Sequence, residues 1–182
     1  MKNRYIELWQ TVERDGVKEL LEWLETTDFY TAPCSTRYHL AREGGLLEHS
    51  LNVYDALIIK VTEDMRESAV ISSLGHDLCK ANFYIQEMRN AKENGVWVQK
   101  PYYTVKDQFP YGHGEKSALL VNRFIKLKPV EFMAIRWHMG GFTAGIQDYG
   151  LSQAMSEAYK TYPLAILLHM ADMESNYLVE KE

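Results

Sequence analysis

The stretch Ser68-Ala69-Val70-Ile71-Ser72-Ser73-Leu74-Gly75-His76-Asp77-Leu78-Cys79-Lys80 joins an apolar helical pattern to two adjacent polar residues. Its apolar residues recur at the spacing of one helix face, which predicts a core helix over residues 68–80. Adjacent helical side chains point about 100° apart, so His76 and Asp77 share one ion only if it lies between both directions. Buried polar groups need partners, and a metal ion would satisfy both side chains. A surface His-Asp pair at the end of a core helix explains the dipeptide equally well.

The same periodicity predicts helices on both sides of this stretch. The expected ranges are 2–13, 17–28, 46–60, 114–126, 129–139, 151–160 and 163–179. Residues 29–44 contain Pro33 and lead into Gly44-Gly45, which predicts a long ordered loop.

The helical rhythm breaks between residues 82 and 111. Asn94-Gly95 is a turn signal with β-prone residues on both sides, and Pro101 interrupts the second β-prone run. We expect a small hairpin of two or three strands around residues 88–106. The predicted fold class is therefore all-α, a helical bundle with a small β-hairpin insertion.

Length and composition limit the possible classes of protein. A chain of 182 residues with 46% hydrophobic and 25% charged residues predicts one globular domain. The net charge of -5 argues against a protein that coats nucleic acid in bulk. Apolar runs such as Ala165–Leu168 are too short for a membrane helix, and the first residues lack the apolar core of a signal peptide. With two cysteines and no secretory signal, we expect a cytoplasmic protein without membrane partners.

Histidine and aspartate residues recur at the ends of the apolar segments. The candidates are His49, His76, Asp77, His113, His138 and Asp172. Imidazole and carboxylate groups suit Zn, Fe, Mn or Co, and no cysteine has the spacing of a zinc finger. Taken singly, each candidate also has an ordinary structural explanation, such as a helix cap or a solvent-facing side chain.

As an ordered set, these residues resemble the HD-domain superfamily of metal-dependent phosphohydrolases. The matching strings are Gly44–Ser50, Gly75–Lys80, Gly112–Gly114, Arg136–Gly140 and Leu168–Asp172. The nearest subgroup is the HD domain of bacterial exoribonucleases of the YhaM type, which also has a β-prone stretch before its glycine-histidine motif. The resemblance implies one HD-type domain over residues 1–182, with N-terminal helices in 1–35 and a metal-binding helical core in 36–178.

The resemblance also implies a ligand set. His49, His76, Asp77 and Asp172 would hold a first metal ion. His113 and His138 resemble the extra histidines of relatives with a second ion, or they bind the substrate phosphate. The implied cofactor is one or two divalent transition metal ions, chosen from Mn, Fe, Co, Ni and Zn.

The expected function is hydrolysis of a nucleotide or related small phosphoester by metal-activated water. Asp77 would be both a ligand and the group that orients or deprotonates the water. Lys80, one turn after His76, would lie at the opening of the same metal site and neutralise the charge of the phosphate. Lys116 and Arg136 are further candidates for phosphate binding, and a solvated helix face is the ordinary alternative for Lys116.

Several points stay open from the sequence. His39 is a possible pocket-wall residue, and His169 is either a partner of the ligands or a histidine at the core edge. The hairpin aromatics Trp97, Tyr102 and Tyr103 either stack on a base or pack on the helices. Two other functions fit the same ligand set: a di-iron oxygenase of HD type, and a non-catalytic nucleotide-binding regulatory module.

Overall fold

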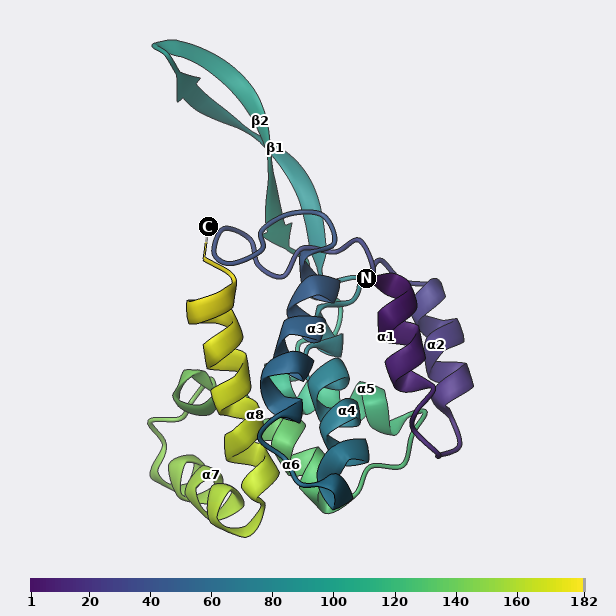
Figure 1. Cartoon of the computed structure of the whole chain (residues 1–182). Helices are drawn as coiled ribbons and strands as arrows, with labels where there is room; N and C mark the ends of the chain where they lie inside the picture. The colour runs from purple at the N-terminus through teal and green to yellow at the C-terminus, as the bar shows by residue number, and fades with distance from the viewer. Residues whose placement is uncertain (182) are drawn as a thin grey trace.

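Residues 1–181 are described by a computed structural model, and they form a mostly helical body with one antiparallel β-hairpin (Figure 1). The α-helices are α1 (Lys2–Trp9), α2 (Val17–Glu25), α3 (Gly45–Ile58), α4 (Arg66–Gly75), α5 (His113–Asn122), α6 (Pro129–Trp137), α7 (Tyr149–Thr161) and α8 (Pro163–Glu174). The hairpin consists of β1 (Tyr84–Glu93) and β2 (Val96–Val105). A mainly helical fold with a small hairpin insertion is thereby confirmed, and residues 29–44 contain no helix or strand, as expected.

The predicted helix over residues 68–80 is wrong in its second half. Helix α4 ends at Gly75, and a short 3₁₀ segment (Leu78–Lys80) follows. Asp77 lies between them with φ −110° and ψ 17°, outside the helical region. His76 and Asp77 therefore stand at a break in the helix, so the 100° angle of adjacent helical residues does not constrain them.

The hairpin begins earlier than expected, at Tyr84, and has two strands. Asn94 and Gly95 form its two-residue turn, both with positive φ (49° and 87°), as a primed turn requires. Pro101 lies inside β2 opposite Met88 and does not separate two strands. The proline is tolerated because each strand of a two-stranded sheet has one free edge.

The helices surround α3 and α4, which pack on each other (Figure 1). One hydrophobic cluster joins α1 and α2 to α3, α4, α5 and α6, with Tyr5, Trp9 and Phe29 fully buried. A second cluster lies between α3, α6 and α8. Helices α4, α5 and α6 contact one another, and this contact positions the site described below.

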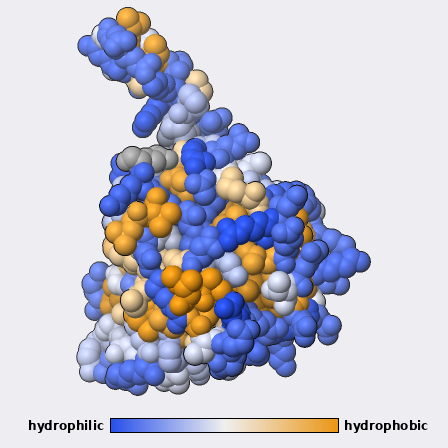
Figure 2. Space-filling view, viewed as in Figure 1, coloured by the Kyte–Doolittle hydropathy of each residue, from blue (hydrophilic) through white to orange (hydrophobic). Residues whose placement is uncertain are grey.

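The hairpin projects away from the helical body (Figure 1). Figure 2 shows it as mainly hydrophilic with scattered hydrophobic patches. Met88 and Val96 are among its exposed hydrophobic residues. In residues 1–181, no helix combines the length and the apolar composition needed to cross a bilayer.

Candidate metal centre

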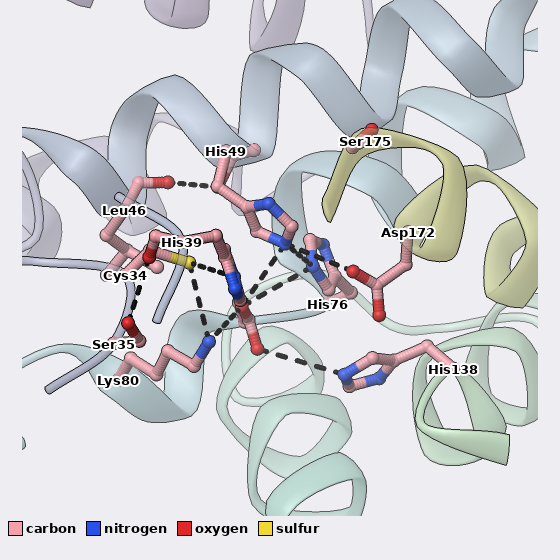
Figure 3. Close-up of polar contacts among 12 residues, drawn as sticks. Cys34, Ser35, His39, Leu46, His49, His76, Lys80, His138, Asp172 and Ser175 are labelled. Carbon is pink, nitrogen blue, oxygen red and sulfur yellow. Dashed lines mark hydrogen bonds and ion pairs between the residues drawn. The ribbon is translucent and has the colours of Figure 1, made fainter. Parts of the chain in front are cut away.

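Six histidine and aspartate side chains from five segments converge in the interior. Figure 3 labels four of them, His49, His76, His138 and Asp172. They are His49 in α3, His76 and Asp77 directly after α4, His113 at the start of α5, His138 directly after α6, and Asp172 in α8. Nε2 of His49 lies 3.2 Å from Nε2 of His76 and 3.2 Å from Oδ1 of Asp172. All six predicted ligands are therefore brought together.

Asp77 occupies the middle of this His/Asp cluster. Its Oδ1 lies 2.8 Å from Nε2 of His113 and 3.8 Å from Nε2 of His138. Its Oδ2 lies 3.5 Å from Nε2 of His76 and 3.7 Å from Nε2 of His49. The two oxygens thus face two different pairs of imidazoles, and each pair forms with Asp77 a group spaced to hold a metal ion.

His76 and His138 are oriented by their own helices. Nδ1 of each ring donates to the carbonyl oxygen three residues earlier, Ser73 and Ile135, over 2.7 Å. A carbonyl only accepts, so each Nδ1 carries the proton and each Nε2 has the lone pair that a metal binds. Burial lowers the pKa of His76 and lowers that of His138 to about 3, so both rings are neutral.

Nε2 of His138 has no hydrogen-bond partner among the described residues, although the side chain is buried. An unpaired polar atom in the interior costs free energy, and native proteins rarely leave one without a reason. A cation next to this nitrogen would supply the missing partner.

The other two imidazoles, His49 and His113, lie beside acidic side chains that raise their pKa values. Burial lowers the pKa of His49, but Cys34 and the carboxylates of Asp172 and Glu180 outweigh it and raise the pKa well above the usual value. Burial also lowers the pKa of His113, but Cys79 and Asp77 outweigh it and raise the pKa to about 10. Metal binding at these two rings would displace protons, as it does at any protonated ligand.

Glu180 completes the surroundings of His49 and was not predicted. Nδ1 of His49 donates to its carboxylate, 3.0 Å from Oε1, and Asn52 donates to the same oxygen over 2.9 Å. A carboxylate on the outer nitrogen of a metal-binding histidine fixes the ring and leaves Nε2 free for the metal. Glu180 lies in a charged, terminal Glu-Lys-Glu segment, which from sequence alone is typical of a solvated end.

The two cysteines also lie at the cluster, although their spacing gave no indication of it. Sγ of Cys34 lies 3.2 Å from Nε2 of His39, and Sγ of Cys79 lies 3.2 Å from Nδ1 of His113. Both thiols are free and buried. His39 and His169 also lie next to the cluster. His39 contacts Cys34, and Nδ1 of His169 donates to the carbonyl of His138 over 2.6 Å.

Lys80 is the predicted phosphate-binding residue that reaches the cluster. Its Nζ lies 2.7 Å from Oδ2 of Asp77. Burial lowers the pKa of Lys80, but Asp77 outweighs it and raises the pKa well above the usual value, so the amine is charged. Burial raises the pKa of Asp77, but Lys80 and the histidines outweigh it and hold the pKa well below the usual value.

Lys116 and Arg136 point elsewhere. Nζ of Lys116 lies 2.5 Å from Oδ1 of Asp107. Nη2 of Arg136 lies 2.5 Å from Oε1 of Glu115, and the guanidinium lies 4.0 Å from the centroid of the Trp137 ring. Both cations already have anionic partners away from the cluster.

A cavity of about 510 Å³ opens onto the cluster, a size typical of small-molecule sites. Cluster residues form its floor, and aromatic and methionine side chains form much of its wall. The lining residues are Tyr38, His39, His49, Asp77, Lys80, His113, Met139, Phe142, His169, Asp172, Met173, Asn176 and Tyr177. The aromatics Trp97, Tyr102 and Tyr103 of the hairpin are not among them.

Comparisons of the chain with protein-family models, with curated proteins and with solved structures find no match.

Proposed function

We propose that this protein is a metal-dependent phosphohydrolase of the HD-domain type, acting on a nucleotide or related small phosphoester. The observation that carries the proposal is the convergence of four imidazoles and two carboxylates in one cluster beneath a cavity. The ordered motifs of the sequence support it independently, because their spacing along the chain resembles that superfamily.

The donor set fits one or two divalent transition metal ions. His49, His76, Asp77 and Asp172 would hold the first ion, and His113 and His138 would hold a second, with Asp77 shared between them. The two oxygens of Asp77 face the two pairs of imidazoles, so its carboxylate would be a ligand common to both ions. When bound, such ions act as Lewis acids and lower the pKa of a coordinated water towards about 7.

The residues of the chain have separate roles in this proposal. The Lys80 ammonium, fixed by Asp77, presents positive charge at the cavity floor and would attract a phosphate oxygen. Glu180 keeps the His49 ring in one orientation. The apolar and aromatic wall, including Phe142 and Tyr177, would hold the organic part of the substrate above the metal-binding floor.

A di-iron oxygenase is a second candidate, favoured by the shared position of Asp77. Histidine and bridging carboxylate ligands also suit a pair of iron ions. The two candidates differ in their requirement for oxygen. Turnover of phosphoesters with Mn²⁺ or Co²⁺ under anaerobic conditions would support the hydrolase, and substrate-dependent oxygen consumption with iron would support the oxygenase.

The test combines metal binding with a hydrolysis screen. Purified protein is loaded with Mn²⁺, Fe²⁺, Co²⁺ or Ni²⁺, its metal content is measured, and it is screened on nucleoside mono- and triphosphates, cyclic nucleotides, dinucleotides and short RNA. We expect bound metal, metal-dependent phosphate-ester cleavage and a higher melting temperature with metal. Asp77→Ala should lose the metal, the thermal shift and about 100-fold or more of the activity, because it removes the shared ligand.

Asp64→Ala is the matched control, since Asp64 is exposed in a short 3₁₀ segment away from the cluster. It should retain metal and activity. The hydrolase proposal fails if the loaded protein cleaves none of these substrates, or if cleavage persists in Asp77→Ala. A nucleotide that raises the melting temperature without being cleaved would identify a binding module instead.

A further inference from the structure

A second set of metal-binding atoms adjoins the His/Asp cluster on the side of the loop between α2 and α3. The donor atoms of Cys34, His39 and His49 all lie within 4.8 Å of one another. Figure 3 shows the three side chains next to one another. Cys34 and His49 are buried, whereas His39 is half-buried and lines the cavity.

The loop holds Cys34 and His39 together by local hydrogen bonds. The amide of Cys34 donates to the carbonyl of Leu40 over 3.0 Å. The hydroxyl of Ser35 donates to the carbonyl of His39 over 2.9 Å and accepts from the amide of Tyr38 over 2.8 Å. These bonds close the segment into a small ring, and Sγ of Cys34 thereby faces the His39 imidazole.

A cation beside a cysteine sulfur favours the thiolate form. Nζ of Lys80 lies 3.6 Å from Sγ of Cys34. On metal binding the S–H bond breaks, its proton passes to solvent, and the sulfur lone pair forms the bond to the metal without any change of oxidation state.

We propose that Cys34, His39 and His49 form a thiolate-containing metal position that takes a thiophilic divalent cation such as Zn²⁺, Fe²⁺ or Co²⁺. Thiolate and imidazole ligands favour these ions over Mg²⁺ or Mn²⁺, which prefer oxygen donors. His49 belongs to both sets of donors and has one free lone pair, at Nε2, so an ion at this position and the first ion of the His/Asp cluster would compete for that ring. The proposal goes beyond hydrolysis, because it concerns metal binding with or without a substrate.

Cobalt reports a thiolate ligand directly, through a sulfur-to-cobalt charge-transfer absorption in the near ultraviolet. The full-length protein is titrated with Co²⁺ under reducing, anaerobic conditions, and the absorption is recorded without substrate. We expect the charge-transfer band in the unaltered chain and its loss in Cys34→Ser. Cys79→Ser is the matched control: it changes the other buried thiol, beside His113, and should keep the band.

His39→Ala covers the case in which Cys34→Ser fails to fold, because His39 is half-buried in a loop. It should weaken Co²⁺ binding at this position about 10-fold or more, seen as a shift of the band titration to higher cobalt concentration. The proposal is overturned if no charge-transfer band forms, if the band disappears in Cys79→Ser but not in Cys34→Ser, or if His39→Ala leaves the titration unchanged. A protein that shows the band but cleaves no phosphoester would overturn the hydrolase proposal alone.

Discussion

Gly114 is a single residue on which the geometry of the cluster depends. It follows His113 at the beginning of α5, where α5 approaches the end of α6. A Cβ atom at this position would lie 2.2 Å from the carbonyl oxygen of Arg136 and 2.8 Å from its carbonyl carbon. These are backbone atoms two residues before His138, so they cannot move aside without moving that ligand.

Gly114→Ala should therefore loosen the α5–α6 contact. We expect a loss of about 1–3 kcal/mol in the free energy of unfolding and weaker metal binding, because His113 and His138 separate. Urea denaturation and metal titration measure the two effects. Gly141→Ala is the control, since a Cβ there meets nothing within 4 Å. Equal stability and equal metal affinity for the two variants would contradict the prediction.

Some features of individual residues could be predicted from the local sequence, and others depend on contacts between distant segments. The apolar pattern of α4 could be predicted because it is local, but the end of the helix at Gly75, before His76 and Asp77, could not. The approach of Glu180 to His49 could not, because the two are 131 positions apart and depend on how the segment after α8 packs. Lys116 fitted a phosphate-binding role by spacing, but Asp107 is close enough in space to pair with it.

Among the elements, the β-hairpin contributes least to the body of the protein. The strands pair with each other from Tyr84↔Val105 to Glu93↔Val96 and project outward (Figure 1). Its connection to the site is at its base, where Tyr84 Oη donates to the carbonyl of Cys34 over 3.0 Å. The outer part of the hairpin should therefore be removable without loss of the metal centre.

A shortened chain tests this expectation. Residues 88–101 are replaced by Asn-Gly, so that the pair Glu87↔Tyr102 closes the new turn. We expect the free energy of unfolding to change by less than about 0.5 kcal/mol and metal binding to persist, because most removed side chains are exposed. Tyr84→Phe, which removes the hydrogen bond at the base of the hairpin, should lower the free energy of unfolding by about 1 kcal/mol. Loss of metal binding in the shortened chain would show that the outer hairpin belongs to the site.

At the scale of the whole molecule, Arg14 joins segments far apart in the sequence. Its guanidinium donates to both oxygens of Glu131 in α6, over 2.8 and 2.6 Å, and to Glu67 in α4 over 2.5 Å. The Glu131 side chain is fully buried. Arg14 therefore ties the α1–α2 connection to the two helices that end at His76 and His138.

Arg14→Met should destabilise the fold by about 3–5 kcal/mol, because it leaves the Glu131 charge buried without its cation. Lys18→Met is the control, since the Lys18–Glu22 pair is exposed and should contribute less than about 0.5 kcal/mol. Chemical denaturation at neutral pH measures both variants. A loss of less than 1 kcal/mol in Arg14→Met would contradict the role assigned to this residue.

The same network predicts a dependence on pH. Burial raises the pKa of Glu67, but the hydrogen bond from Arg14 outweighs it and holds the pKa below its ordinary value. A carboxylate with a lowered folded-state pKa stabilises the protein above its unfolded pKa of about 4.3 and loses that contribution as the pH falls. The unaltered protein should therefore lose more stability between pH 6 and pH 3 than Arg14→Met does, as measured by thermal unfolding.

The amino-acid sequence by itself determined the helical class, the Asn94-Gly95 turn of the hairpin and the order of the six ligand candidates. These features depend on spacing within a few residues, which helical and strand periodicity translate into local structure. The tertiary structure alone decided that Glu180, Cys34 and Cys79 join the cluster and that Arg136 pairs with Glu115 instead. Such contacts depend on how distant segments pack, and local periodicity carries no information about the distance between those segments.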